Sequence, residues 1–406
     1  MSEELTIENT NLPADWEIKT LGDVSVFSQG IQVGLKQHIT NPKDGYVRFI
    51  RIVDYTQNTE DIRYVPNPGE KYFVDEDDIV MVRYGSPGLI GRGKSGVIAN
   101  NLFRIKINIE NLTNDYLSYF LSQYKIQKYL SSQGSATMPA LNFGQLKTVD
   151  VLFPKSIPQQ KQIVSILDQA FAAIDRAKVN AEQNLQNAKE LFESYLQNVF
   201  ENKGDDWKEK TLQEVCHKIT DGTHQTPKYF DEGVIFLSSR NVTSGKINWD
   251  KIKYIDEKQH IEMHKRVAPK IGDILLAKNG TTGVAAMVDK DVVFDIYVSL
   301  AHIRSLGSVN PEFLLYFINS PVAKKQFNNR LKGAGVPNLH LKEIREVVIN
   351  FPKSIGVQKQ IVKKLDSLSA ETKKLESIYI QKLADLEEMK KSVLQKAFSG
   401  QLNTKN

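Results

Sequence analysis

Two long segments of the chain, residues 157–201 and 355–399, carry apolar side chains at steps of three and four with charged residues between them. Neither segment contains a proline beyond its first turn. A stripe sustained for about five heptads predicts a helix of roughly 65 Å that pairs with another helix. The predicted seam runs through Ile163, Leu167, Ala170, Ile174, Ala177, Ala181, Leu185, Ala188, Phe192, Tyr195 and Val199 in the first segment, and through Ile361, Leu365, Leu368, Thr372, Leu375, Tyr379, Leu383, Leu386, Met389, Val393 and Ala397 in the second.

The segments that precede these helices, about 1–155 and 207–352, have a different pattern. Short runs rich in β-branched and aromatic residues, such as Tyr46–Val53, alternate with Gly, Pro and Asn. This alternation predicts strands joined by turns. A short helix is expected late in each segment, at 116–122 and at 313–319, so each segment is predicted to form a compact α/β domain.

The second half of the chain repeats the first. Trp16–Val24 returns 191 residues later, and Asp78–Gly88 returns 195 residues later. The sequences FPKSI and QKQIV, which begin at Phe153 and Gln160, return unchanged 198 residues later. Four matches in the same order, with offsets that drift by only seven residues, indicate a true internal repeat with small loop insertions.

The repeat and the long helices together predict the fold class. We expect an α+β protein with two similar mixed α/β domains, separated by two long antiparallel coiled-coil helices and related by a pseudo-two-fold axis. Such a molecule would act as a ruler for a long ligand with two sites in opposite senses, and double-stranded DNA fits that description. The alternative is that the helices form a dimerisation stalk for another function.

Composition narrows the class of protein. The 406 residues are 41% hydrophobic and 25% charged, and 53 basic against 48 acidic residues give a net charge of +5, which permits nucleic-acid binding through local patches. The single cysteine, Cys216, excludes an internal disulfide or a multi-cysteine zinc site. No apolar run is long enough to cross a membrane, and the acidic N-terminal residues lack the apolar core of a secretory signal, so a cytoplasmic protein without membrane contact is expected.

The segment Gly88–Ser95, GLIGRGKS, satisfies the Walker A pattern. The residues that follow it are β-rich, whereas a phosphate-binding P-loop requires a helix there, and the second copy lacks Gly-Lys-Ser. We therefore expect a glycine-rich loop whose Arg92 and Lys94 lie against a phosphate backbone. A nucleotide-binding P-loop remains the alternative.

His260 and His264 stand four residues apart and could form a metal clip on a helix. No third ligand is evident from the sequence, so a solvated helix face and no metal site are expected. Neither a Gly-x-Ser-x-Gly elbow nor a signature around Cys216 is present, so the sequence predicts no catalytic nucleophile.

Two segments have the composition of recognition loops. Lys218–Lys228 concentrates Thr, His and Gln on a tight turn, and Gln29–His38 occupies the corresponding place in the first copy. Amide, hydroxyl and guanidinium groups reach base edges, while lysines contact phosphates. Because the frame repeats while these loops differ, two domains that read different sequences are indicated.

These features together resemble the specificity (S) subunit of type I restriction-modification systems, and the likeness covers nearly the whole chain. It is carried by the opening Pro13–Trp16, the stretch Asp221–Pro227, the segment Gly272–Leu276, and the Gly-x-x-x-Pro-x-Leu loop that ends at Leu339, whose counterpart in the first copy is Ser135–Leu141. One departure is that the helices lack the glutamate with which family members often begin them, which predicts frayed helix starts.

The resemblance implies two target recognition domains, 1–155 and 207–352, that each read one half of a bipartite, asymmetric DNA sequence. The spacer helices, 156–201 and 353–401, would set the distance between the halves and dock two modification subunits. In the family, those subunits use S-adenosylmethionine to methylate adenine, and restriction subunits use ATP and magnesium to translocate and cut DNA. This chain would then be a non-catalytic reader that holds no cofactor itself.

The side chains expected to contact DNA are basic, amide, hydroxyl or aromatic groups of the loops described above. A P-loop nucleotide-binding protein and a coiled-coil scaffold without DNA affinity remain as other classes. The residues are Lys36, Gln37, His38, Arg83, Tyr84, Arg92 and Lys94 at the first half-site, and Thr223, His224, Gln225, Thr226, Lys228, Arg240, Lys278 and Asn279 at the second.

Overall fold

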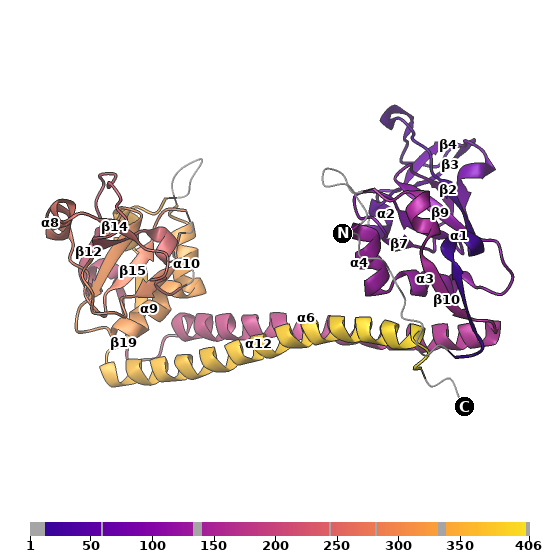
Figure 1. The fold of residues 1–406 in the computed structure, drawn as a ribbon. Helices are drawn as coiled ribbons and strands as arrows, with labels where there is room; N and C mark the ends of the chain where they lie inside the picture. The colour runs from indigo at the N-terminus through magenta and orange to yellow at the C-terminus, as the bar shows by residue number, and fades with distance from the viewer. Residues whose placement is uncertain are drawn as a thin grey trace. The chain divides into compact units, whose positions relative to one another are not determined.

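The computed structural model divides into two compact units, whose boundaries fall inside two long helices (Figure 1). These helices are α6 (Ile157–Glu201) and α12 (Ile355–Phe398). Both begin at the residues that the apolar spacing predicts, Ile157 and Ile355. The first unit is Met1–Ala181 with Lys382–Asn406, the second is Glu182–Gln381, and the described residues are 13–57, 60–132, 140–242, 245–280, 282–331 and 338–402.

The described strands of the first unit form sheets in the orders β2-β9-β6-β7, β4-β3-β8-β5 and β1-β10. All their neighbours are antiparallel except β3 and β8. The elements are β1 (Trp16–Thr20), α1 (Leu21–Val24), β2 (Ser25–Gln29), η1 (Leu35–Gln37), β3 (Tyr46–Ile50), α2 (Val53–Thr56), β4 (Arg63–Pro66), η2 (Glu70–Tyr72), β5 (Phe73–Val74), β6 (Ile79–Val82), β7 (Ile90–Gly91), β8 (Gly96–Ile98), β9 (Leu102–Ile107), α3 (Asn114–Leu121), α4 (Tyr124–Ser132), α5 (Phe143–Lys147) and β10 (Asp150–Pro154).

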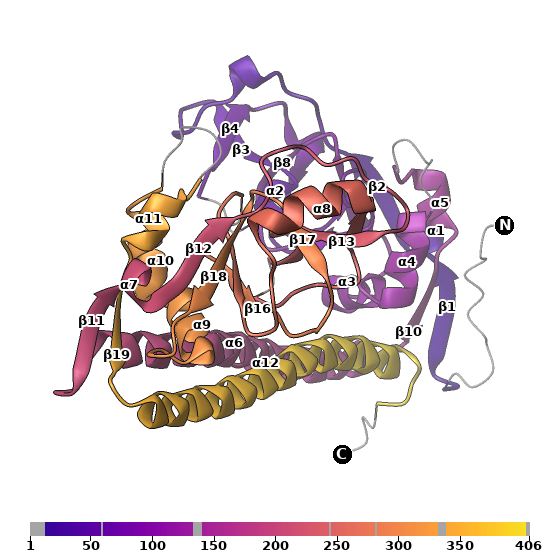
Figure 2. The same ribbon diagram turned by 90° about the vertical axis from the view of Figure 1, so that its left-hand side faces the viewer.

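The second unit (Figure 2) repeats the sheets of the first, except that one described sheet has three strands where the first unit has four. Its described strands form sheets in the orders β12-β18-β15-β16, β14-β13-β17 and β11-β19, with β13 and β17 parallel. The elements are β11 (Trp207–Thr211), α7 (Leu212–Val215), β12 (Cys216–Asp221), β13 (Val234–Leu237), η3 (Ser239–Asn241), β14 (Lys253–Ile255), α8 (Glu257–Arg266), β15 (Ile274–Ala277), β16 (Ala285–Met287), β17 (Phe294–Ile296), β18 (Leu300–Ser305), α9 (Pro311–Asn319), α10 (Pro321–Asn328), α11 (Leu341–Arg345) and β19 (Val348–Pro352).

The repeated sequence motifs are partners in space. In each unit the opening tryptophan strand pairs antiparallel with the closing Phe-Pro strand, so that Trp16 lies opposite Pro154 and Trp207 lies opposite Pro352. The repeated glutamine that follows is fully buried. Gln160 donates to the carbonyls of Asn111 and Pro154 and accepts from the Thr113 N–H, and Gln358 makes the matching three bonds. Since a buried amide must satisfy its polar atoms, this network explains why the QKQIV motif recurs unchanged.

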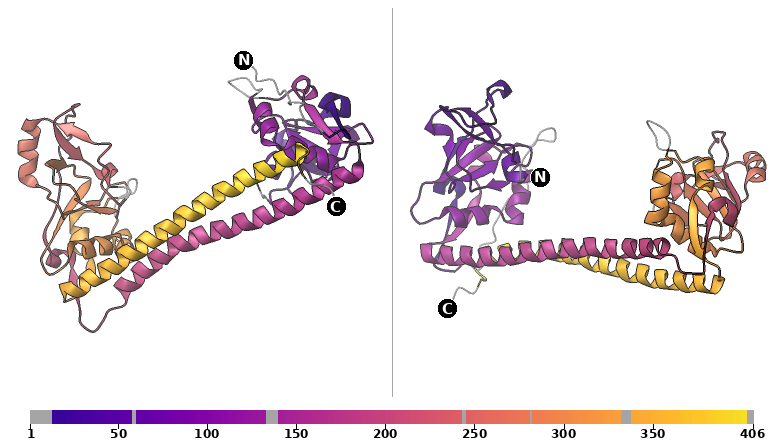
Figure 3. Two further views of the ribbon diagram at one scale, coloured as in Figure 1. Left: turned by 60° about the horizontal axis from the view of Figure 1, so that its bottom comes forward. Right: turned by 180° about the vertical axis from the view of Figure 1, so that it is seen from behind.

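Within each unit the two long helices run side by side and antiparallel (Figure 3). In the first unit Lys178 pairs with Glu387 and Asp175 pairs with Lys390. The residue number therefore rises along α6 as it falls along α12, which is an antiparallel register. The predicted class, two similar mixed domains with long helices, is confirmed. Each unit contains part of both long helices. The predicted domains, 1–155 and 207–352, instead end before the helices begin.

The predicted seam is correct in its first half and wrong at some later positions. Ile163, Leu167 and Ala181 are buried as expected. Near the end of α6, however, Leu196 and Phe200 are buried in place of Tyr195 and Val199, because this end packs against α9 of the second unit. In α12 the predicted positions Leu375 and Met389 are exposed.

Two further predictions concern short elements and membranes. The helices expected at 116–122 and 313–319 are found as α3 and α9. The loops expected before the long helices lie outside the described residues except for their last positions, 140–141 and 338–339. None of the described helices combines the length and apolar character needed to cross a membrane.

Candidate DNA interface

The two predicted recognition loops occupy equivalent positions. One follows β2 and the other follows β12, and each begins with a glycine that lies against the backbone of a neighbouring strand. A Cβ on Gly30 would stand 2.2 Å from the carbonyl oxygen of Ala99, and one on Gly222 would stand 1.8 Å from that of Ile296. Only glycine allows this approach, and the residue after each glycine, Ile31 or Thr223, forms an equivalent parallel bridge before the loop sequences diverge.

A buried carboxylate anchors the loop of the second unit. Asp221 is 2% exposed, and its oxygens bond to Arg266 Nη2 at 2.5 Å and Lys278 Nζ at 3.0 Å. Burial raises the pKa of Asp221, but the hydrogen bonds from Arg266, Lys278 and His224 outweigh burial and hold the pKa below its usual range. Lys278 is itself buried, so its predicted role as a DNA contact is wrong: its charge neutralises Asp221.

The tip of the same loop is open to solvent. Thr223 is buried, and its hydroxyl accepts from the Gln225 N–H, so it shapes the turn. His224, Gln225, Thr226 and Lys228 are exposed, as a recognition loop requires. Helix α8 holds the far end, where Gln259 bonds to both backbone groups of Lys228 at 2.9 and 3.0 Å.

A basic hollow of about 320 Å³ lies beside this loop. Arg240, Lys251 and Lys253 are its exposed cations, and its described lining contains no carboxylate. The full lining is Tyr229, Phe236, Ser238, Ser239, Arg240, Asn241, Lys251, Lys253, Tyr297 and Ser299.

Three aromatic rings form one wall of the basic hollow. The Phe236 centroid lies 6.1 Å from that of Tyr229 and 6.2 Å from that of Tyr297, and Lys253 Nζ stands 3.8 Å from the centre of the Tyr229 ring. Cations beside aromatic faces suit nucleic acid, because phosphates and bases can both be contacted.

Sequence reasoning identified Arg240 but missed the other cations and rings of the basic hollow. The run Lys251-Ile-Lys253-Tyr254 interleaves basic and aromatic residues and could have indicated the site. Asn279 is half-buried and pairs through its backbone with Asn338.

In the first unit, Lys36 and Gln37 lie exposed on the short helix η1. His38 is half-buried: its Nε2 lies 3.2 Å from the Val33 carbonyl oxygen, and its ring meets the edge of Phe49. The His38 ring therefore connects the backbone of its own loop to Phe49 and leaves only part of its surface open to solvent.

Arg83 and Tyr84, which follow β6, are half-buried and form hydrogen bonds with neighbouring polar groups. Arg83 Nε donates to the Leu141 carbonyl, and the Tyr84 hydroxyl donates to Asn100. Both side chains keep part of their surface open.

The glycine-rich segment that matches Walker A has no P-loop geometry. Its Lys94 and Ser95 are followed by strand β8, so the required helix N-terminus is missing from this described segment. Arg92 is ion-paired with Asp115 and Asp77, so a phosphate would have to displace these carboxylates to make the predicted contact. Lys94 Nζ lies 5.8 Å from the centre of the Tyr55 ring and remains half-exposed.

A second buried carboxylate, Asp273, supports strand β15 of the second unit. It accepts from His302 at 2.7 Å and from Arg304 at 2.6 and 2.7 Å. Burial raises the pKa of Asp273, but the bonds from Arg304 and His302 exceed this effect and bring the pKa far below its ordinary value. Burial also raises the pKa of the Cys216 thiol to about 12, which makes this cysteine an inert core residue.

Asp273→Asn should destabilise the second unit by roughly 3 kcal/mol at pH 7, because Arg304 and His302 lose their charged partner. Since the folded pKa lies below the unfolded one, the wild-type advantage is complete above about pH 5 and shrinks as the pH falls. Denaturant unfolding of both proteins between about pH 7 and about pH 2.5 measures this loss, with the exposed Asp231→Asn as control. An unfolding free-energy difference that stays constant across this range would contradict the assignment.

The histidine pair of α8 corrects another prediction. We expected His260 and His264 on a solvated face without a third ligand, but both are half-buried and both contact Asp295 of β17. The sequence hid this carboxylate because it lies on a different element, more than thirty residues along the chain.

Comparison with known proteins places the chain in a family. The model of the type I restriction modification DNA specificity domain matches residues 13–186 and again residues 204–384. The chain is 24% identical to the type I restriction enzyme MjaVIII specificity subunit of Methanocaldococcus jannaschii, over 97% of this chain and 95% of the relative.

Two solved structures share the fold. The HsdS subunit from Thermoanaerobacter tengcongensis has a TM-score of 0.63 at 17% identity, with 99% of this chain and 100% of that one covered. A chain from a study of complex assembly and conformational transition of the type I R-M system has a TM-score of 0.78 at 18% identity, with 97% and 100% covered.

Two copies of a DNA specificity domain on one chain define a protein that recognises DNA and carries no catalytic site of its own. The chain belongs to the family of type I restriction modification DNA specificity subunits.

Proposed function

We propose that each domain reads one half of a bipartite, asymmetric DNA target, and that the long helices set the spacing between the halves. The observation that carries this proposal is the repeat itself. Two copies of one frame present loops of different sequence at the equivalent position after β2 and β12. A shared frame with divergent loops suits the reading of two different half-sites.

The second half-site is read by the exposed loop tip and the basic hollow. His224, Gln225 and Thr226 offer groups for base edges, while Lys228 and Arg240 contact phosphates with Lys251 and Lys253. Tyr229 and Tyr297 supply faces against which sugars of the backbone pack. Thr223 and Asn279 then support the loop.

The first half-site is read chiefly by Lys36 and Gln37 on η1. Arg83, Tyr84 and Lys94 are half-exposed and add contacts near the sheet edge. His38 positions the loop. Arg92 is excluded from the proposed contacts because Asp115 and Asp77 already neutralise it.

The partners of this chain are double-stranded DNA, two modification subunits and restriction subunits with translocase activity. The part of the helices in the second unit exposes Leu191, Tyr195, Leu375, Ile378 and Ile380, whose side chains are 36–56% exposed. We propose that these side chains form part of the surface on which the modification subunits dock. S-adenosylmethionine, ATP and magnesium would be used by those partners.

A map of modified bases in the host genome tests this function. With the gene intact we expect one methylated bipartite adenine motif, which disappears on deletion and returns when the gene is supplied in trans. Replacing the second domain by that of another family member should change one half of the motif and leave the other half unaltered. A motif that survives deletion while the modification subunits are active would overturn the proposal.

A further inference from the structure

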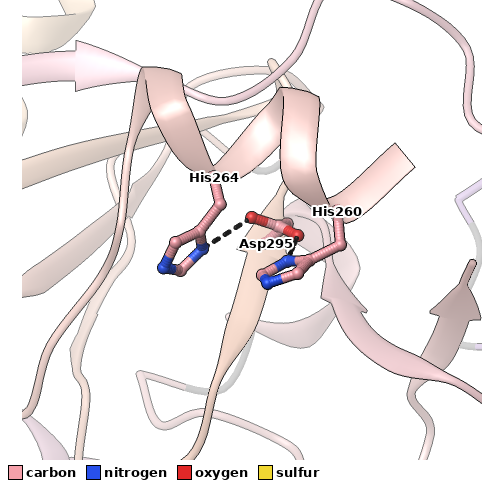
Figure 4. A group of neighbouring side chains, drawn as sticks. All are labelled: His260, His264 and Asp295. Carbon is pink, nitrogen blue, oxygen red and sulfur yellow. Dashed lines mark hydrogen bonds and ion pairs between the residues drawn. The ribbon is translucent and has the colours of Figure 1, made fainter. Parts of the chain in front are cut away.

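Three side chains outside the proposed DNA contacts converge on one point of the second unit (Figure 4). His260 and His264 are four residues apart on α8, so they share one face of the helix. Asp295 faces them from strand β17. His260 Nδ1 lies 2.7 Å from one carboxylate oxygen, and His264 Nδ1 lies 3.0 Å from the other.

The carboxylate of this cluster lies in the protein interior. Asp295 is 1% exposed, and among the described residues no lysine or arginine pairs with it. A buried carboxylate is costly unless a positive charge accompanies it. A bound cation would supply it.

The donor set and its geometry suit a transition metal. Two imidazole nitrogens and one carboxylate oxygen are the ligands of many zinc sites, where three protein groups leave one position for water. The three ligand atoms lie within 4.8 Å of one another, and the edge of a tetrahedral site with ~2.0–2.1 Å bonds is roughly 3.3 Å. The histidine side chains are 15% and 32% exposed, so an ion and a water molecule can reach the site from solvent.

We propose that His260, His264 and Asp295 bind a divalent transition-metal ion of the zinc type. The ion ties α8 to β17. Because its ligands come from these two elements, we assign the ion a structural role.

The position of α8 gives this site a consequence. Gln259, next to the first ligand, holds Lys228 at one end of the recognition loop. Arg266, two residues after the last ligand, holds Asp221 at the other end. An ion that fixes α8 therefore fixes both ends of the loop, an effect that rests on the proposed function.

Metal binding by the full-length chain is the test. Protein stripped with a chelator is titrated with Zn²⁺ by calorimetry and with Co²⁺ by absorption spectroscopy. We expect one site per chain, intense tetrahedral Co²⁺ bands, and at least a 100-fold loss of affinity in the His260→Ala/His264→Ala variant. The exposed His217→Ala should bind as the wild type does.

A hydrogen-bonded His-Asp-His cluster without metal is the competing state. Equal Zn²⁺ affinity in the wild type and the double variant, or octahedral Co²⁺ spectra alone, would overturn the proposal. If the double variant fails to fold, the Zn²⁺ affinity of the His264→Gln variant, changed at the more exposed ligand, is compared with that of the wild type. Together with the wild-type Co²⁺ spectrum, this comparison decides whether the site binds metal. The titrations contain no DNA, so their failure and a failure of DNA recognition are separate results.

Discussion

Replacing Arg240, Lys251 and Lys253 together by alanine should weaken binding of target DNA by roughly 100-fold at moderate salt. Each lysine or arginine that neutralises a phosphate contributes a slope of about 0.9 to the dependence of log K on log salt. If all three cations of the basic hollow contact phosphates, the triple variant should lower that slope by about 2.7. Fluorescence anisotropy between 50 and 300 mM salt measures the affinity and the slope together.

A matched variant separates this local effect from net charge. Lys208, Lys258 and Lys265 are exposed on the same unit but lie outside the basic hollow. Their replacement by alanine removes the same charge, and we expect little loss of affinity. If both triple variants reduce the slope equally, the basic hollow has no special role in DNA binding.

Removing seven residues from each long helix should shorten the spacer of the DNA target by about three base pairs. One heptad corresponds to ~10.5 Å of helix at 1.5 Å per residue, and B-DNA rises 3.4 Å per base pair. Residues 182–188 and 377–383 are opposite each other in the antiparallel register set by Lys178 with Glu387. Their joint deletion keeps the heptad phase on both helices.

The readout is the methylated motif in a host that carries the shortened gene in place of the original. We expect the original motif to lose methylation and a motif with the same two halves and a shorter spacer to gain it. Deletion from α6 alone should abolish methylation at both motifs, because the paired stripes lose their register. An unaltered spacer in the doubly shortened protein would show that the helices do not set the distance.

Patterns local in the chain could be predicted from the sequence. The heptad stripe predicted both long helices within a few residues of their ends, and the repeat predicted two similar units. The end of α6 could not be assigned in this way. The Phe200 ring packs edge-to-face against Phe313 and Phe317. The Phe398 ring of α12 makes the same kind of contact with Tyr116 and Phe120. Such packing against a distant helix moves the buried stripe by one position.

The errors at the candidate site have the same cause. Lys278 and Arg92 look like free cations in the sequence, yet each meets a carboxylate far from it in the chain, Asp221 and Asp115. Burial and charge pairing depend on which elements the fold brings together. The loops could be recognised because their composition is a local property of the sequence. The function of a single cation in a loop could not, because it depends on which distant residues the fold places beside it.

The division of the chain between the two units has a consequence for its synthesis. The second unit is one continuous stretch, Glu182–Gln381, but the first unit needs residues from both ends of the chain. Leu394, Ala397 and Phe398 belong to its core. At ~5–20 residues per second, the ribosome takes on the order of 10–40 s to add the intervening 200 residues. During that time Tyr116 and Phe120 of the nascent first domain lack their aromatic partner, so the domain that is made first is the one completed last.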